Sequence, residues 1–241
     1  MEYYYTPGYK VNQENNTLLI DDDFEYRHLV KVLRKREGDR IDITDGERNV
    51  YHCEIIHIDK FIIECNILSR EYNVFEPEVN LHLYIAPLKN SDRFEFAVEK
   101  AVELGVVSIT PVITKNTVKK MSQKETNLQR LHRIIISAMG QSQRCLLPKL
   151  DNIITFGELL DRERGNKNRI VMYEFSEKDS KFVYDNTSKD VYLLIGPEGG
   201  FSKEEIEKLR ESGWQAASLG ERKLRAETAA IVSVFQILNR N

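Results

Sequence analysis

The sequence predicts an α/β protein with two domains, and three observations support this. Short unbroken apolar runs, of which residues 191–195 (VYLLI) are the clearest, end at glycine and precede helical patterns, as in a parallel sheet buried on both faces. The first 70 residues instead contain short runs of alternating polarity, typical of half-buried strands. Residues 71–78, with Pro77 and no apolar periodicity, are the best linker candidate. We therefore expect domains at residues 1–72 and 73–241.

The first domain is expected to be a small β-barrel around one helix. The spacing of His28, Leu29, Val32 and Leu33 predicts a helix over residues 25–33, which ends at Gly38-Asp39. Alternation then predicts a strand, Asp45-Gly46 predicts a hairpin turn, and further apolar runs predict two more strands. The predicted strands are residues 40–44, 50–56 and 61–68.

In the second domain, strands and helices are expected to alternate. Ser91 is a plausible N-cap for a helix over residues 92–104, whose apolar side chains follow the 3.6-residue period up to a stop at Gly105. A long helix is expected over residues 128–143, and a polar loop over residues 161–168. The predicted strands, besides that at 191–195, are residues 79–86, 106–113 and 169–174.

A glycine-rich turn, Gly196-Pro-Glu-Gly-Gly200, follows the strand at residues 191–195. Glycine accepts positive φ and allows another group to approach the backbone closely, so this turn is shaped to touch a ligand. Ser202 and Glu205 form a capping box, which predicts a helix from about Lys203 to a stop at Gly213. A purely structural strand-to-helix turn is the alternative interpretation.

A second turn, residues 219–225 (LGERKLR), follows a short strand at residues 216–219 and precedes a helix from Glu227 onward. That helix has no further charge until Arg240, so it is expected to be buried on every side. Adjacent strand-turn-helix units bring their turns to the same edge of a sheet, where open α/β folds bind ligands. Neither turn matches the P-loop or the dinucleotide fingerprint, which implies a small ligand other than NAD or a nucleoside triphosphate.

Charge is unevenly distributed along the 241 residues. Residues 1–78 contain 10 Lys/Arg and 17 Asp/Glu, whereas residues 79–241 contain 25 and 21. Two segments are locally basic, as contacts with a phosphate backbone require. Their basic residues are Arg27, Lys31, Arg34, Lys35, Arg36 and Arg40 in the first, and Lys115, Lys119, Lys120, Lys124, Arg130, Arg133, Arg144 and Lys149 in the second. Nucleic-acid binding is favoured, and solvated helix faces are the alternative.

Several other classes of protein are not indicated. No run approaches the roughly 18 apolar residues of a membrane span, and no signal peptide is recognisable, so a cytoplasmic location is expected. Cys53, Cys65 and Cys145 are unclustered, which argues against a disulfide framework or a zinc site. The histidines include no HExxH motif, and we predict no metal.

The pair of segments LLIGPEGGFSKEEIE and LGERKLRAETAA resembles the RsmE family, the ribosomal RNA uridine-N3 methyltransferases of the SPOUT superfamily. The resemblance implies a deep trefoil knot, a bound S-adenosylmethionine, and a homodimer whose active site draws on both subunits. It also implies that the turns and the end of strand 169–174 bind the cofactor. The cofactor-binding candidates are Met172, Tyr173, Leu194, Ile195, Gly196, Pro197, Glu198, Gly199, Gly200, Leu219, Gly220, Leu224 and Arg225.

Three further segments are similar to the same family and imply RNA contacts. EYRHLVKVLRKREGDRIDITDG resembles its PUA-like domain, KNSDRFEFAVEKAVELGV looks like a family signature, and MGQSQR resembles a third pattern in which Gly140 replaces a glutamate. The RNA-binding candidates are Arg27, Arg34, Lys89, Arg93, Lys100, Gln141 and Arg144. Surface charge that serves the scaffold alone is the alternative. Gly140 is also expected to lower the stability of the helix over residues 128–143 by about 1 kcal/mol relative to alanine.

The implied function is methylation of N3 of a uridine in small-subunit (16S) ribosomal RNA. Uracil N3 keeps its proton at neutral pH, so we expect Arg225 to stabilise the developing anion and Glu227 or Glu198 to orient Arg225 or accept the proton. The alternative for Arg225 is an ion pair with Glu227 or Glu221. Ala226 stands where the family usually has threonine. Methylation of another RNA position and a non-catalytic role in ribosome assembly are the alternative functions.

Overall fold

The computed structural model describes residues 2–118, 125–174, 185 and 187–239, with the side chains of residues 125–127 excepted. The chain divides into two compact units, Met1–Glu76 with Ile136–Leu147, and Pro77–Ile135 with Pro148–Asn241. The division differs from the expected domains in two respects, because the boundary follows Glu76 and not residue 72, and because residues 136–147 return to the first unit. Lys119, Lys120 and Lys124 of the second basic segment lie outside the described residues. None of the described helices combines the length and the apolar composition needed to cross a membrane.

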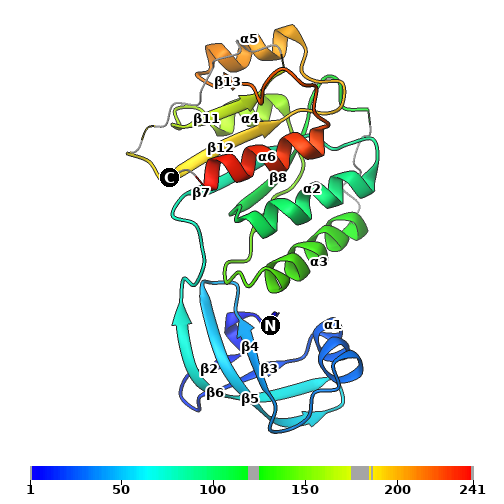
Figure 1. The fold of residues 1–241 in the computed structure, drawn as a ribbon, viewed down its shortest axis with the longest axis vertical. Helices are drawn as coiled ribbons and strands as arrows, with labels where there is room; N and C mark the ends of the chain where they lie inside the picture. The colour runs from blue at the N-terminus through cyan, green and yellow to red at the C-terminus, as the bar shows by residue number, and fades with distance from the viewer. Residues whose placement is uncertain (1, 119–124, 175–184, 186, 240–241) are drawn as a thin grey trace. The chain divides into compact units, whose positions relative to one another are not determined.

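The first unit is a six-stranded sheet with a short helix. Its strand order is β1-β4-β5-β6-β3-β2, with β1 and β4 parallel and the other pairs antiparallel. Register shifts in the β5/β6 pair bend the sheet, which is visibly curved in Figure 1. Strands β1 and β2 stand at the two ends of this strand order. The strands are β1 (Tyr3–Tyr5), β2 (Val11–Asn12), β3 (Thr17–Ile20), β4 (Arg40–Thr44), β5 (Asn49–Asp59) and β6 (Ile62–Tyr72).

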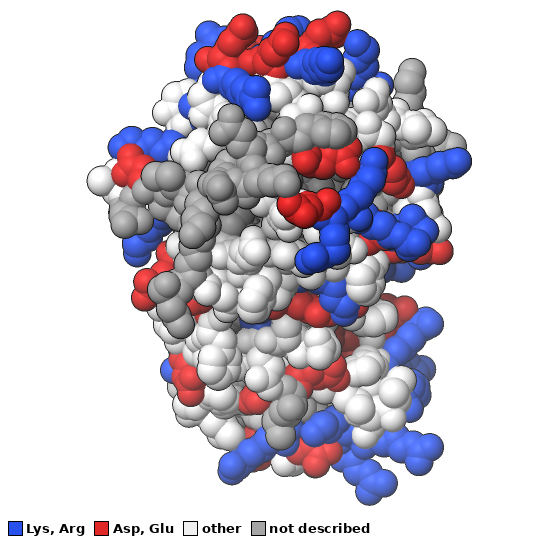
Figure 2. Space-filling view, turned by 45° about the horizontal axis from the view of Figure 1, so that its top comes forward, with Lys and Arg blue, Asp and Glu red and all other residues white. Residues whose placement is uncertain are grey.

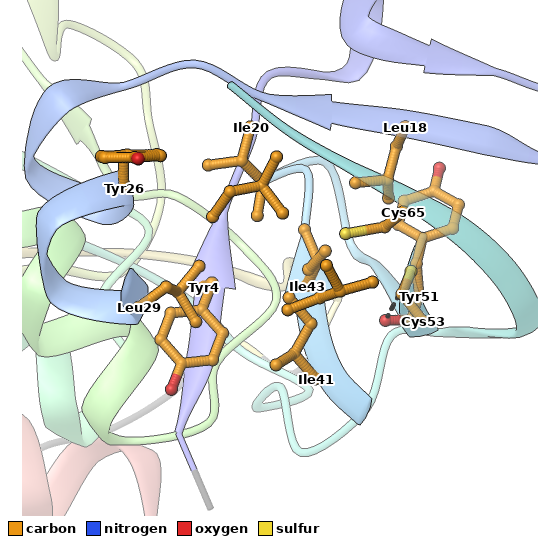
Figure 3. Packing of buried hydrophobic residues seen from close by; sticks show 12 residues of the cluster. Tyr4, Leu18, Ile20, Tyr26, Leu29, Ile41, Ile43, Tyr51, Cys53 and Cys65 are labelled. Atoms are coloured by element: carbon orange, nitrogen blue, oxygen red, sulfur yellow. Dashed lines mark hydrogen bonds between the residues drawn. The ribbon is translucent and has the colours of Figure 1, made fainter. Parts of the chain in front are cut away.

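The expected helix of the first unit is present in two parts. Helix α1 (Asp23–Tyr26) begins at Asp22, whose carboxylate accepts hydrogen bonds from two backbone N–H groups, and a π-helical turn (Arg27–Val32) continues it. Leu29 of this turn packs into an apolar cluster with strand side chains such as Ile20 and Ile43 (Figure 3). Strands β1 and β3 were not predicted, although the core depends on them.

The segment that returns to the first unit is fixed by a buried ion pair. One oxygen of Glu76 accepts hydrogen bonds from the backbone N–H groups of Cys145 and Leu146, both at 2.9 Å. The other oxygen lies 2.7 Å from an Nη of Arg144, and the two side chains are only 3% (Arg144) and 1% (Glu76) exposed. Further contacts to the β4–β5 turn, such as that from Thr44 Oγ1 to the Cys145 carbonyl at 3.1 Å, hold the segment in place.

Gly140 belongs to this returning segment, and its lack of a side chain is required by packing. A Cβ at this position would lie 2.3 Å from the carbonyl oxygen of Tyr3, which is far inside van der Waals contact. A larger side chain, such as the glutamate that the resemblance implied, therefore cannot be accommodated here without moving the backbone. From the sequence, Gly140 was expected only to lower the stability of the helix. In the structure, this glycine allows the helix backbone to approach the backbone of Tyr3 closely.

We expect Gly140→Ala to destabilise the protein by roughly 1–3 kcal/mol, because overpacking displaces β1 or the helix end. The midpoint of urea denaturation would measure the loss. Gly157→Ala is the matched control, since its Cβ would meet nothing closer than Thr155 Oγ1 at 4.0 Å. Equal stability of the two variants would contradict the packing argument.

The second unit is a parallel sheet of order β10-β8-β7-β12-β11-β13, with β9 paired to β8. Its strands are β7 (Asn80–Ile85), β8 (Ser108–Ile113), β9 (Lys149–Leu150), β10 (Ile154–Thr155), β11 (Arg169–Met172), β12 (Asp190–Ile195) and β13 (Gln215–Ala217). Its helices are α2 (Ser91–Leu104), α3 (Glu125–Gln141), α4 (Phe156–Arg162), α5 (Lys203–Glu211) and α6 (Ala226–Leu238), of which α3 extends into the first unit. Helices α2 and α6 lie side by side against the sheet, and α4 lies behind it (Figure 1).

Local signals placed most of these elements correctly. The capping box of Ser202 and Glu205 is formed at the start of α5, and Gly105, with φ of 117°, ends α2. The N-cap of α2 is Asn90 rather than Ser91, because the Asn90 side chain accepts from the Asp92 N–H. Helix α4 was missed and overlaps the start of the expected polar loop, although the Thr155/Glu158 capping box marks its beginning.

Helix α6 is not buried on every side, as we had expected. Ala230, Val234 and Ile237 are buried against the unit, whereas Phe235 is 53% exposed. The apolar composition of α6 therefore exceeds what one interior face requires. A second apolar face remains uncovered in the single chain.

Candidate active site

The two glycine turns line one cavity at the carboxyl ends of β11, β12 and β13. The cavity has a volume of about 360 Å³ and is bounded by residues 172–174, 195–201, 218–220 and 222–226, together with Arg93 and Ala229. The expectation that both turns meet at one edge of the sheet is confirmed. Of the cofactor-binding candidates, only Leu194 does not line it, since its side chain packs into the core with Tyr84 and Trp214.

The first turn requires glycine at three positions, at one because of a positive φ and at two because neighbouring atoms leave no room for a Cβ. Gly200 has φ of 65°, and its N–H donates to the Pro197 carbonyl at 2.8 Å. A Cβ on Gly196 would lie 2.8 Å from the ring of Phe201, and one on Gly199 would lie 3.1 Å from Asn116. The turn therefore tolerates no side chain at these positions without rearrangement.

Glu198 ties the first turn to the loop that follows β7. Its Oε1 accepts a hydrogen bond from the backbone N–H of Lys89 at 2.9 Å. One oxygen of this exposed carboxylate is thus engaged by a neighbouring backbone. The contact favours a role for Glu198 in positioning the turn over a role as proton acceptor.

The second turn and the end of β11 form the opposite rim. Gly220, with φ of 103°, donates its N–H to Ser218 Oγ at 3.2 Å. Lys223 Nζ lies 3.5 Å from the carboxylate of Glu174, so a pair of exposed charges joins these two segments beside the cavity. Glu174, Phe201, Ser218, Arg222 and Lys223 line the cavity and were not among the candidates. Their position next to the predicted turns was the only sequence signal for them.

Arg225 is exposed at the cavity rim and is the residue from which α6 begins. Its side chain makes no capping hydrogen bond. Within the described part of the chain, no ion pair joins it to Glu227 or Glu221, the two alternative partners. The guanidinium is therefore available to a ligand in the cavity.

Glu227 lies beside Arg93 and not beside Arg225. Its side chain is buried in the first turn of α6, with Oε1 3.7 Å from Arg93 Nε. Among the described residues, Oε2 has no hydrogen-bond partner. Because Arg93 lines the cavity and Glu227 does not, the carboxylate is placed to act through Arg93.

The RNA-binding candidates divide by exposure. Arg27 is exposed and paired with Asp23, Arg34 is exposed at a residue with φ of 56°, and Lys89 and Gln141 are also exposed. Arg144, in contrast, is buried. Its side chain is ion-paired with Glu76 and cannot reach a phosphate. Figure 2 shows basic side chains in several local groups on the visible face, with acidic side chains between and beside them.

Lys100 is engaged on its own helix. Hydrogen bonds to Glu103 and Glu99, both at 2.7 Å, raise the pKa of Lys100. Its positive charge is therefore compensated by two neighbouring acids. This contact pattern favours a local ion-pair role, which was the alternative interpretation of the residue.

The cysteines are core residues. Cys53, Cys65 and Cys145 are buried and free, and burial raises the pKa of Cys65 to about 12 and that of Cys145 to about 11. These thiols are thus protonated and unreactive at neutral pH. The described residues contain no group of three or more His, Cys, Asp or Glu suited to a metal ion.

Comparison with known proteins gives matches over nearly the whole chain. Residues 75–238 match the model of an RNA methyltransferase domain, and residues 20–68 match that of an RNA methyltransferase PUA domain. The ribosomal RNA small subunit methyltransferase E of Mesomycoplasma hyopneumoniae is 38% identical, with 92% of this chain and 94% of the relative covered. The protein of the same name from Bacillus subtilis is 30% identical, with 88% and 86% covered.

A solved structure gives the same result. The ribosomal RNA small subunit methyltransferase E of Neisseria gonorrhoeae, bound to S-adenosyl methionine, superposes with a TM-score of 0.87 at 30% identity, covering 99% of this chain and 98% of that one. The predicted resemblance is confirmed by the two domain models, the curated relatives and this structure together. The chain belongs to the ribosomal RNA small subunit methyltransferase E family.

Proposed function

We propose that the chain transfers a methyl group from S-adenosylmethionine to N3 of a uridine in small-subunit (16S) ribosomal RNA. The observation that carries the proposal is the cavity formed by both glycine turns in a chain of this family. A relative 30% identical over nearly the same length has been solved with S-adenosyl methionine bound, which supports the choice of cofactor. We expect the reaction to take place in the cytoplasm.

The residues of the cavity suit this cofactor. A volume of about 360 Å³ is that of a small-molecule site, and Met172, Leu219 and Leu224 offer apolar walls. Backbone groups of the two turns are close enough to the cavity to hold the adenosine. The cofactor supplies the electrophilic methyl group, so the protein needs chiefly to align donor and acceptor.

Arg225 is proposed to stabilise the uracil anion that develops when the N3 proton is lost. An exposed guanidinium at the cavity rim, with no carboxylate partner among the residues that the structure describes, can donate to the uracil carbonyl oxygens. Glu227 is proposed to hold Arg93 against the same site, and Glu198 to fix the first turn through Lys89. Solvent is then proposed as the proton acceptor, since Glu227 does not line the cavity and one oxygen of Glu198 already accepts the Lys89 N–H.

The first unit is proposed to bind RNA phosphates through Arg27 and Arg34, and in the second unit Lys89 and Arg93 are proposed to contact RNA beside the cavity. Arg27 on the π-helical turn and Arg34 just beyond its end are both exposed, which suits them to phosphate contacts. Domains at residues 1–72 and 73–241 remain our proposal for these two roles, with residues 136–147 added to the first. Arg144 is omitted because it is buried.

A deep trefoil knot is proposed for the segment that contains the two turns. It is supported by family membership, and by strand order, because β12 lies between β7 and β11 while β13 pairs with the far side of β11. Both turns then lie against one cavity. A knotted chain path would restrict the motion of the two turns more than the hydrogen bonds within each turn do.

A homodimer is proposed through the outer faces of α2 and α6, with a second copy of the chain as the partner. Phe96 of α2 is 46% exposed and Phe235 of α6 is 53% exposed, on two helices that pack together. Exposed phenylalanines on two helices that pack together, one of them almost wholly apolar, indicate a surface covered in the working protein. The symmetric pairing of one patch with itself is the commonest form of dimer.

Phe235→Asp is expected to shift the protein from dimer to monomer, because the charge would be buried against the second copy. Sedimentation velocity at micromolar concentration would measure the change. Phe61→Asp is the control, since Phe61 is 57% exposed in the other unit. A monomeric wild-type protein would contradict the proposed dimer.

The function is tested by incubating purified protein with methyl-labelled S-adenosylmethionine and undermethylated small ribosomal subunits, and then digesting the RNA. Label in N3-methyluridine is the expected result. Label in another nucleoside would support the alternative that the chain modifies a different RNA position. Absence of cofactor binding by calorimetry, with the protein folded, would support the alternative of a non-catalytic assembly factor.

A further inference from the structure

The loop that follows β8 contacts the first glycine turn through one side chain. Asn116 Nδ2 donates to the carbonyl oxygens of Gly199 at 3.2 Å and Gly200 at 3.1 Å. The fit is close, because a Cβ on Gly199 would lie 3.1 Å from the Cβ of Asn116. One amide group therefore joins two consecutive peptide groups of the turn to a neighbouring loop.

The loop that presents Asn116 is itself fixed on both sides. Thr117 Oγ1 accepts the Thr114 N–H at 3.0 Å, and the Thr117 N–H donates to the Thr114 carbonyl at 3.1 Å. The backbone N–H of Lys115 donates to Glu205 Oε1 at 2.8 Å, and Glu205 also completes the capping box of α5. Asn116 is thus held from the end of β8 and from the start of the helix that follows the turn.

We infer that Asn116 is a positioning residue for cofactor binding, acting through the first glycine turn. Glycine-rich segments have many accessible backbone states, and a binding site loses affinity when those states must be restricted on binding. The two hydrogen bonds of Asn116 restrict the peptide groups at Gly199 and Gly200 before the ligand arrives. Gly199 and Gly200 line the cavity, whereas Asn116 does not, so its effect is indirect.

This inference rests on the proposed function, because it assumes that the cavity binds S-adenosylmethionine. According to this inference, part of the affinity for S-adenosylmethionine comes from Asn116, which lies outside both glycine turns. Asn116 also lies on a different strand-loop connection, that of β8, which was not predicted to take part in cofactor binding.

Asn116→Ala is expected to raise the Kd for S-adenosylmethionine about tenfold, as calorimetry would measure it, because two hydrogen bonds of modest net value are lost. The KM for the cofactor should rise similarly, while kcat at saturating cofactor stays within about threefold. A defect that acts only through stability would lower the active fraction and leave Kd and KM unchanged. If Asn116→Ala does not fold, Asn116→Ser, which keeps one donor, replaces it with a smaller expected loss.

Asn116→Asp gives a sharper test because it keeps the shape of the side chain. At pH 7.5 its carboxylate would face the two carbonyl oxygens of Gly199 and Gly200, so the Kd is expected to rise more than in Asn116→Ala. Protonation restores one O–H donor, and the Kd should fall again towards pH 5 in this variant relative to wild type. A merely structural role would not produce this difference in pH dependence.

Lys115→Ala is the matched control on the same loop. It removes an exposed pair with Glu204 at 2.9 Å and keeps the Lys115 backbone contact to Glu205. Its Kd should equal that of wild type. Wild-type binding with an unchanged Kd in both Asn116→Ala and Asn116→Asp would overturn the inference, whereas absence of binding by wild type would overturn the proposed function itself.

Discussion

Replacing Arg225 with alanine is expected to lower kcat at saturating cofactor by at least about a hundredfold, while the Kd for S-adenosylmethionine changes by less than about tenfold. The guanidinium is exposed at the cavity rim and has no ion-pair partner within the described residues, so its charge is free to act on the uracil anion. A group that acts mainly in the transition state affects kcat and leaves cofactor binding nearly unchanged. Single-turnover methylation of the RNA and calorimetry of the cofactor would give the two quantities.

Arg222→Ala is the matched control for this experiment. Arg222 is an exposed arginine of the same turn and also lines the cavity, but it does not begin α6. It should retain a kcat within a few-fold of wild type. Loss of cofactor binding in parallel with kcat in Arg225→Ala would instead identify Arg225 as a residue that supports the turn.

Replacing Glu76 with alanine is expected to destabilise the first unit by roughly 3–5 kcal/mol, because removal of one member of a buried ion pair leaves the other charge uncompensated. Arg144 is 3% exposed, and the same carboxylate accepts two backbone N–H groups at 2.9 Å. Urea denaturation followed by circular dichroism would measure the loss. Hydrogen exchange would locate it, with faster exchange in β4 and β5 and little change in β12.

Arg27→Ala is the control for Glu76→Ala. It breaks an ion pair of similar length, 2.9 Å, whose side chains are 67% and 58% exposed. Exposed pairs of this kind contribute at most about 1 kcal/mol. Comparable losses of stability in the two variants would contradict the assignment of Glu76 as the fixed point of the returning segment.

Elements with strong local signals could be predicted from the sequence. Helix α5 has a capping box at Ser202 and Glu205, and β12 is a continuous apolar run before glycine. These features act over a few residues, so the tertiary structure did not need to be known. Strand β1 was missed because its stability comes mainly from a distant partner, through its parallel pairing with β4. Helix α4 was missed although the capping box of Thr155 and Glu158 gave a local signal for its start.

The candidate site was predicted in part for the same reason. The glycine turns were found because their composition is unusual, and the cavity they line was expected from the parallel topology. The direction in which an individual side chain points could not be predicted from the sequence. Leu194 points into the core, and Glu227 lies beside Arg93 across the site, because neighbouring elements determine these contacts.

The sequence by itself determined the α/β class, the two glycine turns and the family, since periodicity, capping residues and long motifs are properties of contiguous residues. Tertiary structure alone decided that Arg144 is buried, that Gly140 accommodates a backbone contact with Tyr3, and that Asn116 holds the first turn. Each of these depends on atoms brought together from distant parts of the chain. Long-range packing and burial change the role of a charged or small residue. The residues next to it in the sequence do not reveal these contacts.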